Sequence, residues 1–377
     1  MSRTLHRLCR AGLVCAAAAL LVFGTSARGT PDTLHPADTP GLHQSTSFAS
    51  QIAALSEPNG YFDTDNLISN ERSYLQVIPE LGRRGVQGGA YIGVGPDTNF
   101  SYIAAVRPAV AVIIDVRRDN LLLHLLFKAL FAESATRAEY LALLLGRTVP
   151  PVRDDSRAAP IERLVAHFGR EGRRADIGFR RRLDNTLERI GVPLSADDKA
   201  TIARFHQRFI DEGLDLRFHS TGRAPQSHYP TYRDLLLETD RDGRQANYLA
   251  SEDAFQFVKS LHARDLIIPV VGDLSGPSAL AAIGRMLTAR RQPLSAFYTS
   301  NVEFYLYGQG TFARFAENLR HIPRAERSMM IRSVFGRYSG YGRPGDASTS
   351  HLQPVQDLLR GVADGRFRSY AQLVAGR

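Results

Sequence analysis

Two apolar runs on either side of a glycine-containing turn place the strongest constraint on how this chain folds. Residues 90–94 read AYIGV and residues 109–116 read AVAVIIDV, while residues 99–106 between them have a helical pattern. Runs this apolar are typical of strands that are buried on both faces of a parallel sheet. The segment therefore predicts a strand, a turn, a helix and a second strand, with helices covering both sides of the sheet.

The rest of the chain continues the alternation of strands and helices. Strand signals return at residues 265–273, 294–300 and 329–336, with helices expected after 274 and near 311–319. This order predicts an α/β fold with a doubly wound, mostly parallel, Rossmann-like sheet. Between the second and third strands, residues 120–262 are leucine-rich up to Gly146 and then mostly helical and more polar, which predicts a large helical insertion.

The N-terminus has the pattern of an export signal. Three arginines in the first ten residues precede a short apolar run and the small-residue site TSA, so we expect a signal peptide over 1–27. Residues 28–47 are rich in Pro, Thr, Asp and His and are expected to be a flexible linker, followed by the folded domain over 48–377. The expected location is periplasmic or secreted, with an uncleaved anchor in the inner membrane as the alternative.

Cleavage of that signal would also remove both cysteines. Cys9 and Cys15 lie within the first 27 residues, so the exported chain would carry no thiol. This excludes a disulfide framework, a zinc–thiolate site and a cysteine nucleophile from the mature protein. The histidines lack metal-ligand spacing, and no metal site is expected.

The turn after the first strand suits a ligand that approaches the backbone closely. Gly93 and Gly95 lie at this turn, and Asp115 ends the next strand, where an acid in such folds accepts hydrogen bonds from ribose hydroxyls. The dinucleotide fingerprint requires a third glycine where this chain has Thr98, so a pyrophosphate site is disfavoured. A nucleoside-type small molecule is the expected ligand.

These residues resemble the first motif of Rossmann-like S-adenosylmethionine-dependent methyltransferases. VVGD, ending at Asp273, looks like their third strand, and AFYTSNVEFYL occupies the position of their fourth-strand motif. The resemblance implies that Gly93 and Gly95 contact the methionine portion of S-adenosylmethionine, Asp115 the ribose and Asp273 the adenine. It also implies that Asn301 and Tyr298 face the reacting group.

The methyl acceptor is left open, because Asn301 is followed by Val302 and Glu303 where amino-methylating members of that class carry a Pro-Pro-aromatic element. Phrases such as YIGVGPDTNFSYIAAVRP and PVVGDLSGP also resemble an uncharacterised family of bacterial proteins over residues 48 to the C-terminus. That second resemblance implies no reaction.

Three functions remain open: a methyltransferase, an exported binding protein that uses the same crevice without chemistry, and a scaffold that binds a protein through the helical insertion. Nucleic acid is not an expected partner, although the net charge is +9, because acids interrupt the basic run at 169–189. Membrane contact is expected only through an uncleaved leader. Arg117 and Arg118 allow either a rim for an anionic substrate or ion pairs, and ion pairs are favoured. We also expect Asp115→Ala to weaken nucleoside binding while leaving the fold intact.

Overall fold

The computed structural model describes residues 47–149, 158–170, 172, 177–222, 226, 228–336 and 347–375. The expected signal peptide at 1–27, and all of the expected linker except Ser47, lie outside the described residues. Among the residues that the structure describes, every helix is too short or too polar to span a membrane.

A six-stranded sheet with the order β3-β2-β1-β4-β5-β6 forms the centre of the fold. Its strands are β1 (Ala90–Gly93), β2 (Val110–Asp115), β3 (Ile267–Val271), β4 (Leu294–Ser300), β5 (Arg324–Phe335) and β6 (Ser348–Pro354). The pairs among β1 to β5 are parallel, and β6 pairs antiparallel with β5. The predicted mostly parallel α/β sheet is confirmed, with all five predicted strands in place.

Strand β6 was not predicted, and its composition explains why. It reads STSHLQP and has almost no apolar side chains, so it lacks the signal that marked the other strands. The buried hydroxyl groups of β6 have hydrogen-bond partners elsewhere in the chain. The Ser73 hydroxyl lies 2.7 Å from that of Ser348 and 3.2 Å from that of Ser350.

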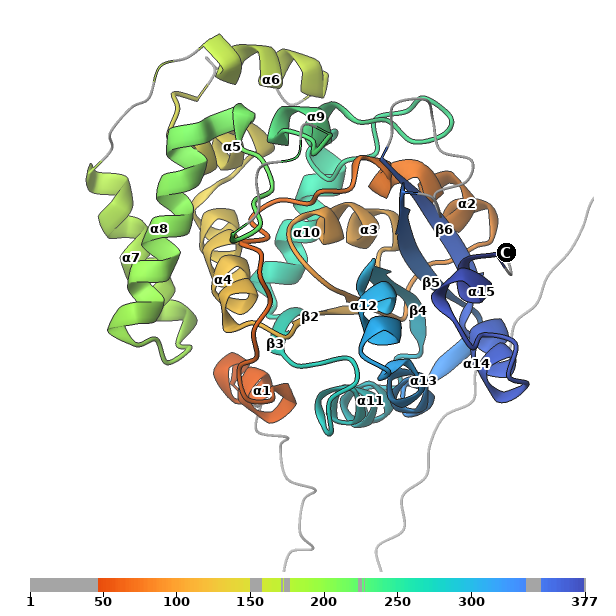
Figure 1. Ribbon diagram of the computed structural model, residues 1–377. Helices are drawn as coiled ribbons and strands as arrows, with labels where there is room; N and C mark the ends of the chain where they lie inside the picture. Colours follow the sequence, from red (N-terminus) through yellow and green to blue (C-terminus); the bar gives the residue numbers. More distant parts are fainter. Residues whose placement is uncertain are drawn as a thin grey trace, which may run out of the picture. The chain divides into compact units, whose positions relative to one another are not determined.

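Helices cover both faces of the sheet (Figure 1). Helices α3, α4 and α10 lie on one side, and α11, α13 and α14 lie on the other. The helices outside the segment between β2 and β3 are α1 (Phe48–Leu55), η1 (Arg72–Val77, a 3-10 helix), α2 (Ile78–Arg83), α3 (Thr98–Val106), α11 (Ala279–Ala289), α12 (Val302–Gly308), α13 (Phe312–Arg320), α14 (Val355–Ala363) and α15 (Tyr370–Ala375).

A long helical segment follows β2, as predicted. It contains α4 (Arg118–Glu133), α5 (Arg137–Leu145), α6 (Ile161–Arg170), α7 (Ile177–Ile190), α8 (Ala196–Glu212), η2 (Gly213–Asp215), α9 (Tyr232–Leu237) and α10 (Glu252–Ala263). In Figure 1, α5 to α9 extend beyond the helices that lie against the sheet.

The leucine-rich stretch up to Gly146 is two helices, separated at residues 134–136. Ser134 donates its hydroxyl back to the Leu130 carbonyl at 2.7 Å, and the Thr136 side chain caps α5. Hydroxyl side chains that bond nearby backbone groups compete with helix continuation, which explains the break. Further along, Ser195 caps α8 and Gly213 ends it with a φ of +58°, as predicted.

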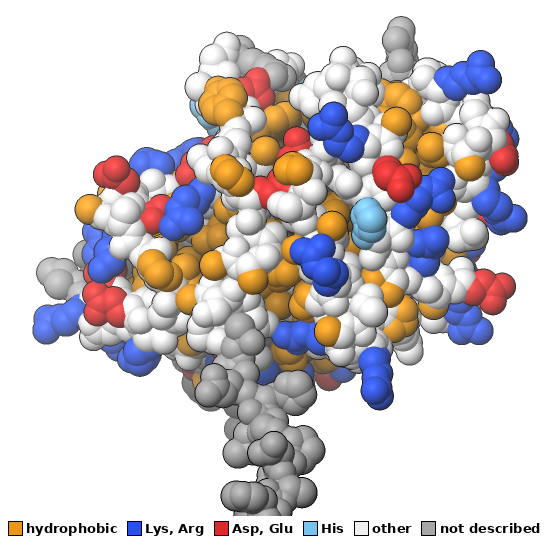
Figure 2. Space-filling view, turned by 90° about the horizontal axis from the view of Figure 1, so that it is seen from below, with side chains coloured by type: hydrophobic (Ala, Val, Ile, Leu, Met, Phe, Trp, Pro, Cys, Tyr) orange, Lys and Arg blue, Asp and Glu red, His pale blue; other side chains and the backbone are white. Residues whose placement is uncertain are grey.

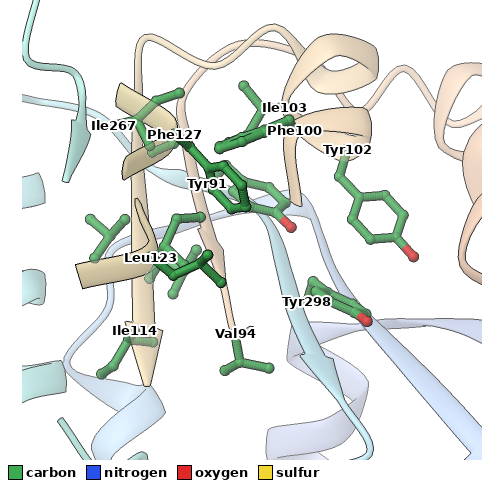
Figure 3. Close-up of a cluster of buried hydrophobic side chains, with 14 of the residues drawn as sticks. Tyr91, Val94, Phe100, Tyr102, Ile103, Ile114, Leu123, Phe127, Ile267 and Tyr298 are labelled. Carbon is green, nitrogen blue, oxygen red and sulfur yellow. The ribbon is translucent and has the colours of Figure 1, made fainter. Parts of the chain in front are cut away.

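The hydrophobic core extends over both faces of the sheet, and one part of it lies between β1, β2 and the helices α3 and α4. Figure 3 shows the aliphatic side chains of Ile114, Leu123 and Ile267 on one side of Tyr91, with Tyr102 and Tyr298 on the other. The hydroxyls of the three tyrosines are directed away from the aliphatic side chains. The core therefore has a polar margin beneath the carboxyl end of β4.

Charged side chains are mixed on the face that carries α1, α11 and α13. Figure 2 shows arginine and lysine side chains spread across this face, with acidic and apolar side chains between them. Mixed surfaces of this kind are usual for solvated protein faces.

Candidate functional site

A cavity of about 220 Å³ opens at the carboxyl ends of the central strands. Its walls come from the carboxyl ends of β1, β2, β3 and β4 and the residues that follow them. Residues between 61 and 70 and side chains of the helical segment and of α12 also line it. The strand order reverses between β1 and β4, and ligands of open α/β sheets bind at such a reversal. The position of this cavity is therefore that of a ligand site.

The turn after β1 is held by an internal hydrogen-bond network. Asn99 donates to the carbonyls of Val94 at 2.9 Å and Pro96 at 2.7 Å, and it accepts from the Tyr91 hydroxyl at 2.8 Å. A Cβ atom on Gly93 would lie 1.9 Å from Asn99 Oδ1. Gly93 thus lies behind the cavity wall and makes space for Asn99.

Gly95 is in the cavity wall itself, with a φ of +84° that favours glycine. Its carbonyl lies 2.9 Å from Nε2 of the buried His124 on α4. Burial lowers the pKa of His124 to about 4, so the ring is neutral at physiological pH and Nε2 donates to the carbonyl. This contact fixes the orientation of the turn.

The carboxylate of Asp97 lies at the start of α3, where Asp97 is the N-cap residue. It is buried, and it accepts hydrogen bonds from Tyr232 at 3.2 Å and Tyr248 at 3.1 Å. Burial raises the pKa of Asp97 to about 6, although both tyrosine hydrogen bonds oppose the shift. Asp97 thus joins the start of α3 to the helical segment, and it is not among the residues that line the cavity.

Asp115 lines the cavity but is also half of an ion pair. Its carboxylate accepts from Arg117 Nε at 3.1 Å, from Nη2 at 3.0 Å and from the Arg117 backbone N–H at 2.9 Å. Both side chains are nearly buried, with exposures of 11% and 8%. Arg118 likewise pairs with Asp198 of α8, at 2.8 Å. Both arginines are therefore in ion pairs, the interpretation favoured from the sequence.

Asp273 lines the cavity from the loop after β3. Its Oδ1 accepts from the Ser275 backbone N–H at 2.7 Å and from the Ser275 hydroxyl at 2.9 Å. The sequence suggested that Ser275 begins the next helix, but α11 begins four residues later, with Ser278 as its N-cap. The hydroxyl of Ser275 instead fixes the Asp273 side chain beside the cavity.

Glu57 is a residue that the sequence did not single out. Its carboxylate accepts from the backbone N–H groups of Ser278 at 2.7 Å, Ala279 at 2.6 Å and Asp273 at 3.2 Å. A Cβ on Gly276 would approach it to 2.3 Å, so a larger residue there would displace the Glu57 carboxylate. Glu57 thus anchors one end of the segment whose residues 61–66 form part of the cavity wall.

The end of β4 supplies the remaining predicted residues. Tyr298 and Asn301 line the cavity together with Ser300 and Tyr305. The Tyr305 ring packs edge-on against Phe62, with ring centroids 5.0 Å apart. The cavity therefore brings together all the predicted site residues except Gly93, and their roles toward a ligand stay predictions.

Glu71 lies next to the end of β4, and it is a second residue that the sequence did not single out. It is fully buried, and its carboxylate accepts hydrogen bonds from the hydroxyls of Tyr298, Ser300 and Ser333. Burial raises the pKa of Glu71, and the three hydrogen bonds oppose that shift. In the sequence, an acid within the moderately apolar stretch LISNERSYLQV was the only signal.

Comparison with known families gives one match. The model of the family described as a domain of unknown function (DUF7790) matches residues 66–154 and 203–375. These ranges include the whole sheet and nearly all of the cavity lining, and residues 155–202 between them contain α6, α7 and the beginning of α8. No curated protein matches the chain.

Proposed function

The chain belongs to the DUF7790 family, and we propose that its cavity binds a nucleoside-type ligand, with S-adenosylmethionine as the candidate for methyl transfer. The observation that carries the proposal is the meeting of Gly95, Asp115 and Asp273 in one cavity at the reversal point of the sheet. Three consecutive strand ends supply these residues, as the resemblance to methyltransferases implies.

The charges of the lining favour a ligand without phosphate groups. Asp115 neutralises Arg117, and Asp273 adds a further negative charge. A phosphate would therefore meet no unpaired cation among the described lining residues. A neutral nucleoside or a sulfonium cation suits this balance, because a positive ligand group is attracted both by a carboxylate and by aromatic rings.

The aromatic residues of the lining supply apolar surface for such a ligand. They come from three parts of the chain, namely Tyr61 and Phe62, Phe218 and Tyr229, and Tyr298 and Tyr305. Tyr61 is 80% exposed, so its ring is available to a molecule at the opening. Small-molecule sites typically combine aromatic side chains with placed polar groups, and this lining contains both.

S-adenosylmethionine, when bound, supplies a methyl group on a positively charged sulfur. The contribution of the chain is to hold donor and acceptor in line and to exclude water, so that proximity and orientation account for most of the rate. By the resemblance, Asn301 and Tyr298 would face the reacting group. The acceptor stays open, because no lining residue identifies it.

A binding protein without chemistry is the second candidate. The carboxylate of Asp115 is already engaged by Arg117, and the cavity of about 220 Å³ is smaller than the roughly 300–1,000 Å³ of sites for drug-sized ligands. S-adenosylmethionine is also a cytoplasmic metabolite, whereas the sequence predicts export. The small cavity and the predicted export favour recognition of a smaller nucleoside outside the cytoplasm.

Thermal unfolding with a ligand panel tests the proposal. Adenosine, S-adenosylhomocysteine and S-adenosylmethionine should raise the melting temperature, whereas ATP and NAD should not. A ligand at 100 times its dissociation constant adds about 2.7 kcal/mol to the stability of the folded state. Asp273→Asn should abolish the shift and Asp364→Asn, at an exposed position away from the cavity, should retain it. No shift with any nucleoside would refute the proposal, and formation of S-adenosylhomocysteine with an added acceptor would separate transfer from binding.

A further inference from the structure

Ser300 has a backbone conformation that a residue other than glycine rarely adopts. It ends β4 with a φ of +53°, and its pairing with β5 shifts register between Tyr298 and Ser300. Register irregularities re-aim side chains, and strained residues concentrate at functional sites. The chain then turns through Asn301 directly into α12. The strand end thus presents the serine at a sharp turn between a strand and a helix.

The side chain of Ser300 connects the cavity to a buried acid. Ser300 is in the cavity lining, and its hydroxyl donates to Oε1 of Glu71. A nucleophilic serine needs a neighbouring group that accepts its proton, and a carboxylate within hydrogen-bond reach fulfils this need. The pair therefore has the geometry of a nucleophile and its base.

The surroundings of Glu71 make it a better base than an exposed carboxylate. Within the described part of the chain, it forms no ion pair, and the titratable groups facing it are the phenols of Tyr91 on β1, Tyr102 on α3 and Tyr298 on β4. Burial raises the pKa of Glu71, and a base is most effective when its pKa is near the working pH. Phenols stay neutral at that pH and add no competing charge.

We propose that Ser300 is a nucleophile of the cavity, with Glu71 as its proton acceptor, and that the pair acts on small neutral carboxylic esters. Oγ of Ser300 attacks the ester carbonyl carbon while its proton moves to Glu71. The bond from carbon to the leaving alkoxide breaks, and the alkoxide takes a proton from a solvent water, leaving hydroxide. The hydroxide then hydrolyses the acyl–serine ester and releases the acid, while the proton held on Glu71 returns to Ser300 Oγ and restores the serine.

The lining favours that substrate class. An anionic ester would meet Asp273, and the cavity of about 220 Å³ admits only a small acyl group. The side-chain amides of Asn70 and Asn301, both in the lining, are donors of the type that stabilises a developing oxyanion. This inference goes beyond the proposed nucleoside binding and does not depend on it, because the ester need not contain a nucleoside.

The experiment is acylation of the full chain with 4-nitrophenyl acetate. We expect a burst of about one 4-nitrophenol per chain and an acetyl group mapped to Ser300 by peptide mass spectrometry. Ser300→Ala should abolish both, and Glu71→Gln should slow acylation by about 100-fold or more. Ser295→Ala is the matched control, because Ser295 lies on the same strand and bonds Gly88 at the other end. It should acylate at the native rate.

The pH profile separates a base from a merely structural acid. Glu71 does not touch the ester and acts through Ser300, so the acylation rate of the native chain should rise with pH as Glu71 loses its proton. A flat profile, acetylation of lysines alone, or a burst that survives in Ser300→Ala would overturn the proposal. Should Glu71→Gln fail to fold, as judged by circular dichroism, the native pH profile still decides.

Discussion

Replacing Asp115 with alanine should destabilise the protein as well as remove a candidate ligand contact. Three hydrogen bonds join Asp115 to Arg117, and the arginine side chain is 8% exposed. Removing the acid leaves a nearly buried guanidinium without its counter-charge, which costs about 3–5 kcal/mol in buried pairs. The structure therefore revises the expectation that this variant leaves the fold intact.

The expected size can be converted into a melting temperature. With about 300 ordered residues and an unfolding entropy of about 2.1 cal/mol/K per residue, a loss of about 3 kcal/mol lowers the melting temperature by about 5 °C. Arg117→Met in the Asp115→Ala background should recover part of that loss, because an apolar side chain needs no partner. Asp364→Ala, which breaks an exposed pair with Arg366, should change the melting temperature by less than about 1 °C.

Calorimetry of the native chain, Asp115→Ala, Arg117→Met and the double variant, with and without adenosine, makes the reasoning testable. A melting temperature for Asp115→Ala equal to that of the native chain would refute the structural role of the pair. If the double variant is stable but binds adenosine as the native chain does, the ribose role of Asp115 is wrong.

Two further predictions concern the turn after β1. Gly93→Ala should destabilise the protein by about 1–3 kcal/mol in urea unfolding, because its Cβ would displace Asn99. Gly82→Ala on α2, where the Cβ meets nothing, is the control, and equal effects would contradict this account. The pKa of Asp97 is raised from 3.8 to about 6, so the stability that it contributes is complete at low pH and is lost as pH rises through that value. Asp97→Asn should therefore remove about 3 kcal/mol of pH dependence between about pH 3 and pH 7, and parallel pH curves for the two chains would refute it.

The sheet could be predicted from the sequence because its strands are continuous apolar runs. Residues 109–116 are apolar except for Asp115, residues 294–300 carry an apolar centre, and the structure places β2 and β4 there. Strand β6 carries Ser348 and Ser350, whose burial depends on hydroxyl partners far away in the chain. A single sequence does not reveal such partners.

The sequence could predict those cavity residues whose positions follow from the order of the strands alone. Asp115 and Asp273 end neighbouring parallel strands, so their proximity follows from the order of the sheet. Glu57 and Glu71 precede β1 and have no place in a strand-end motif. Their positions depend on backbone N–H groups and hydroxyls that only the folded chain brings to them. Gly93 was expected to contact a ligand, whereas the structure shows that it makes space for Asn99. The sequence does not reveal this either, because the position of Asn99 depends on hydrogen bonds formed in the folded chain.

The two tyrosine hydroxyls at Asp97 have a consequence for dissecting this protein. Tyr232 belongs to α9 and Tyr248 to the stretch before α10, yet both bond an acid at the first turn after β1. In a truncated form without these helices, Asp97 would lose both tyrosine hydrogen bonds. The start of α3 would then be exposed to solvent. Shortening is better tolerated at α6 and α7, in the interval 155–202 that the family match leaves out.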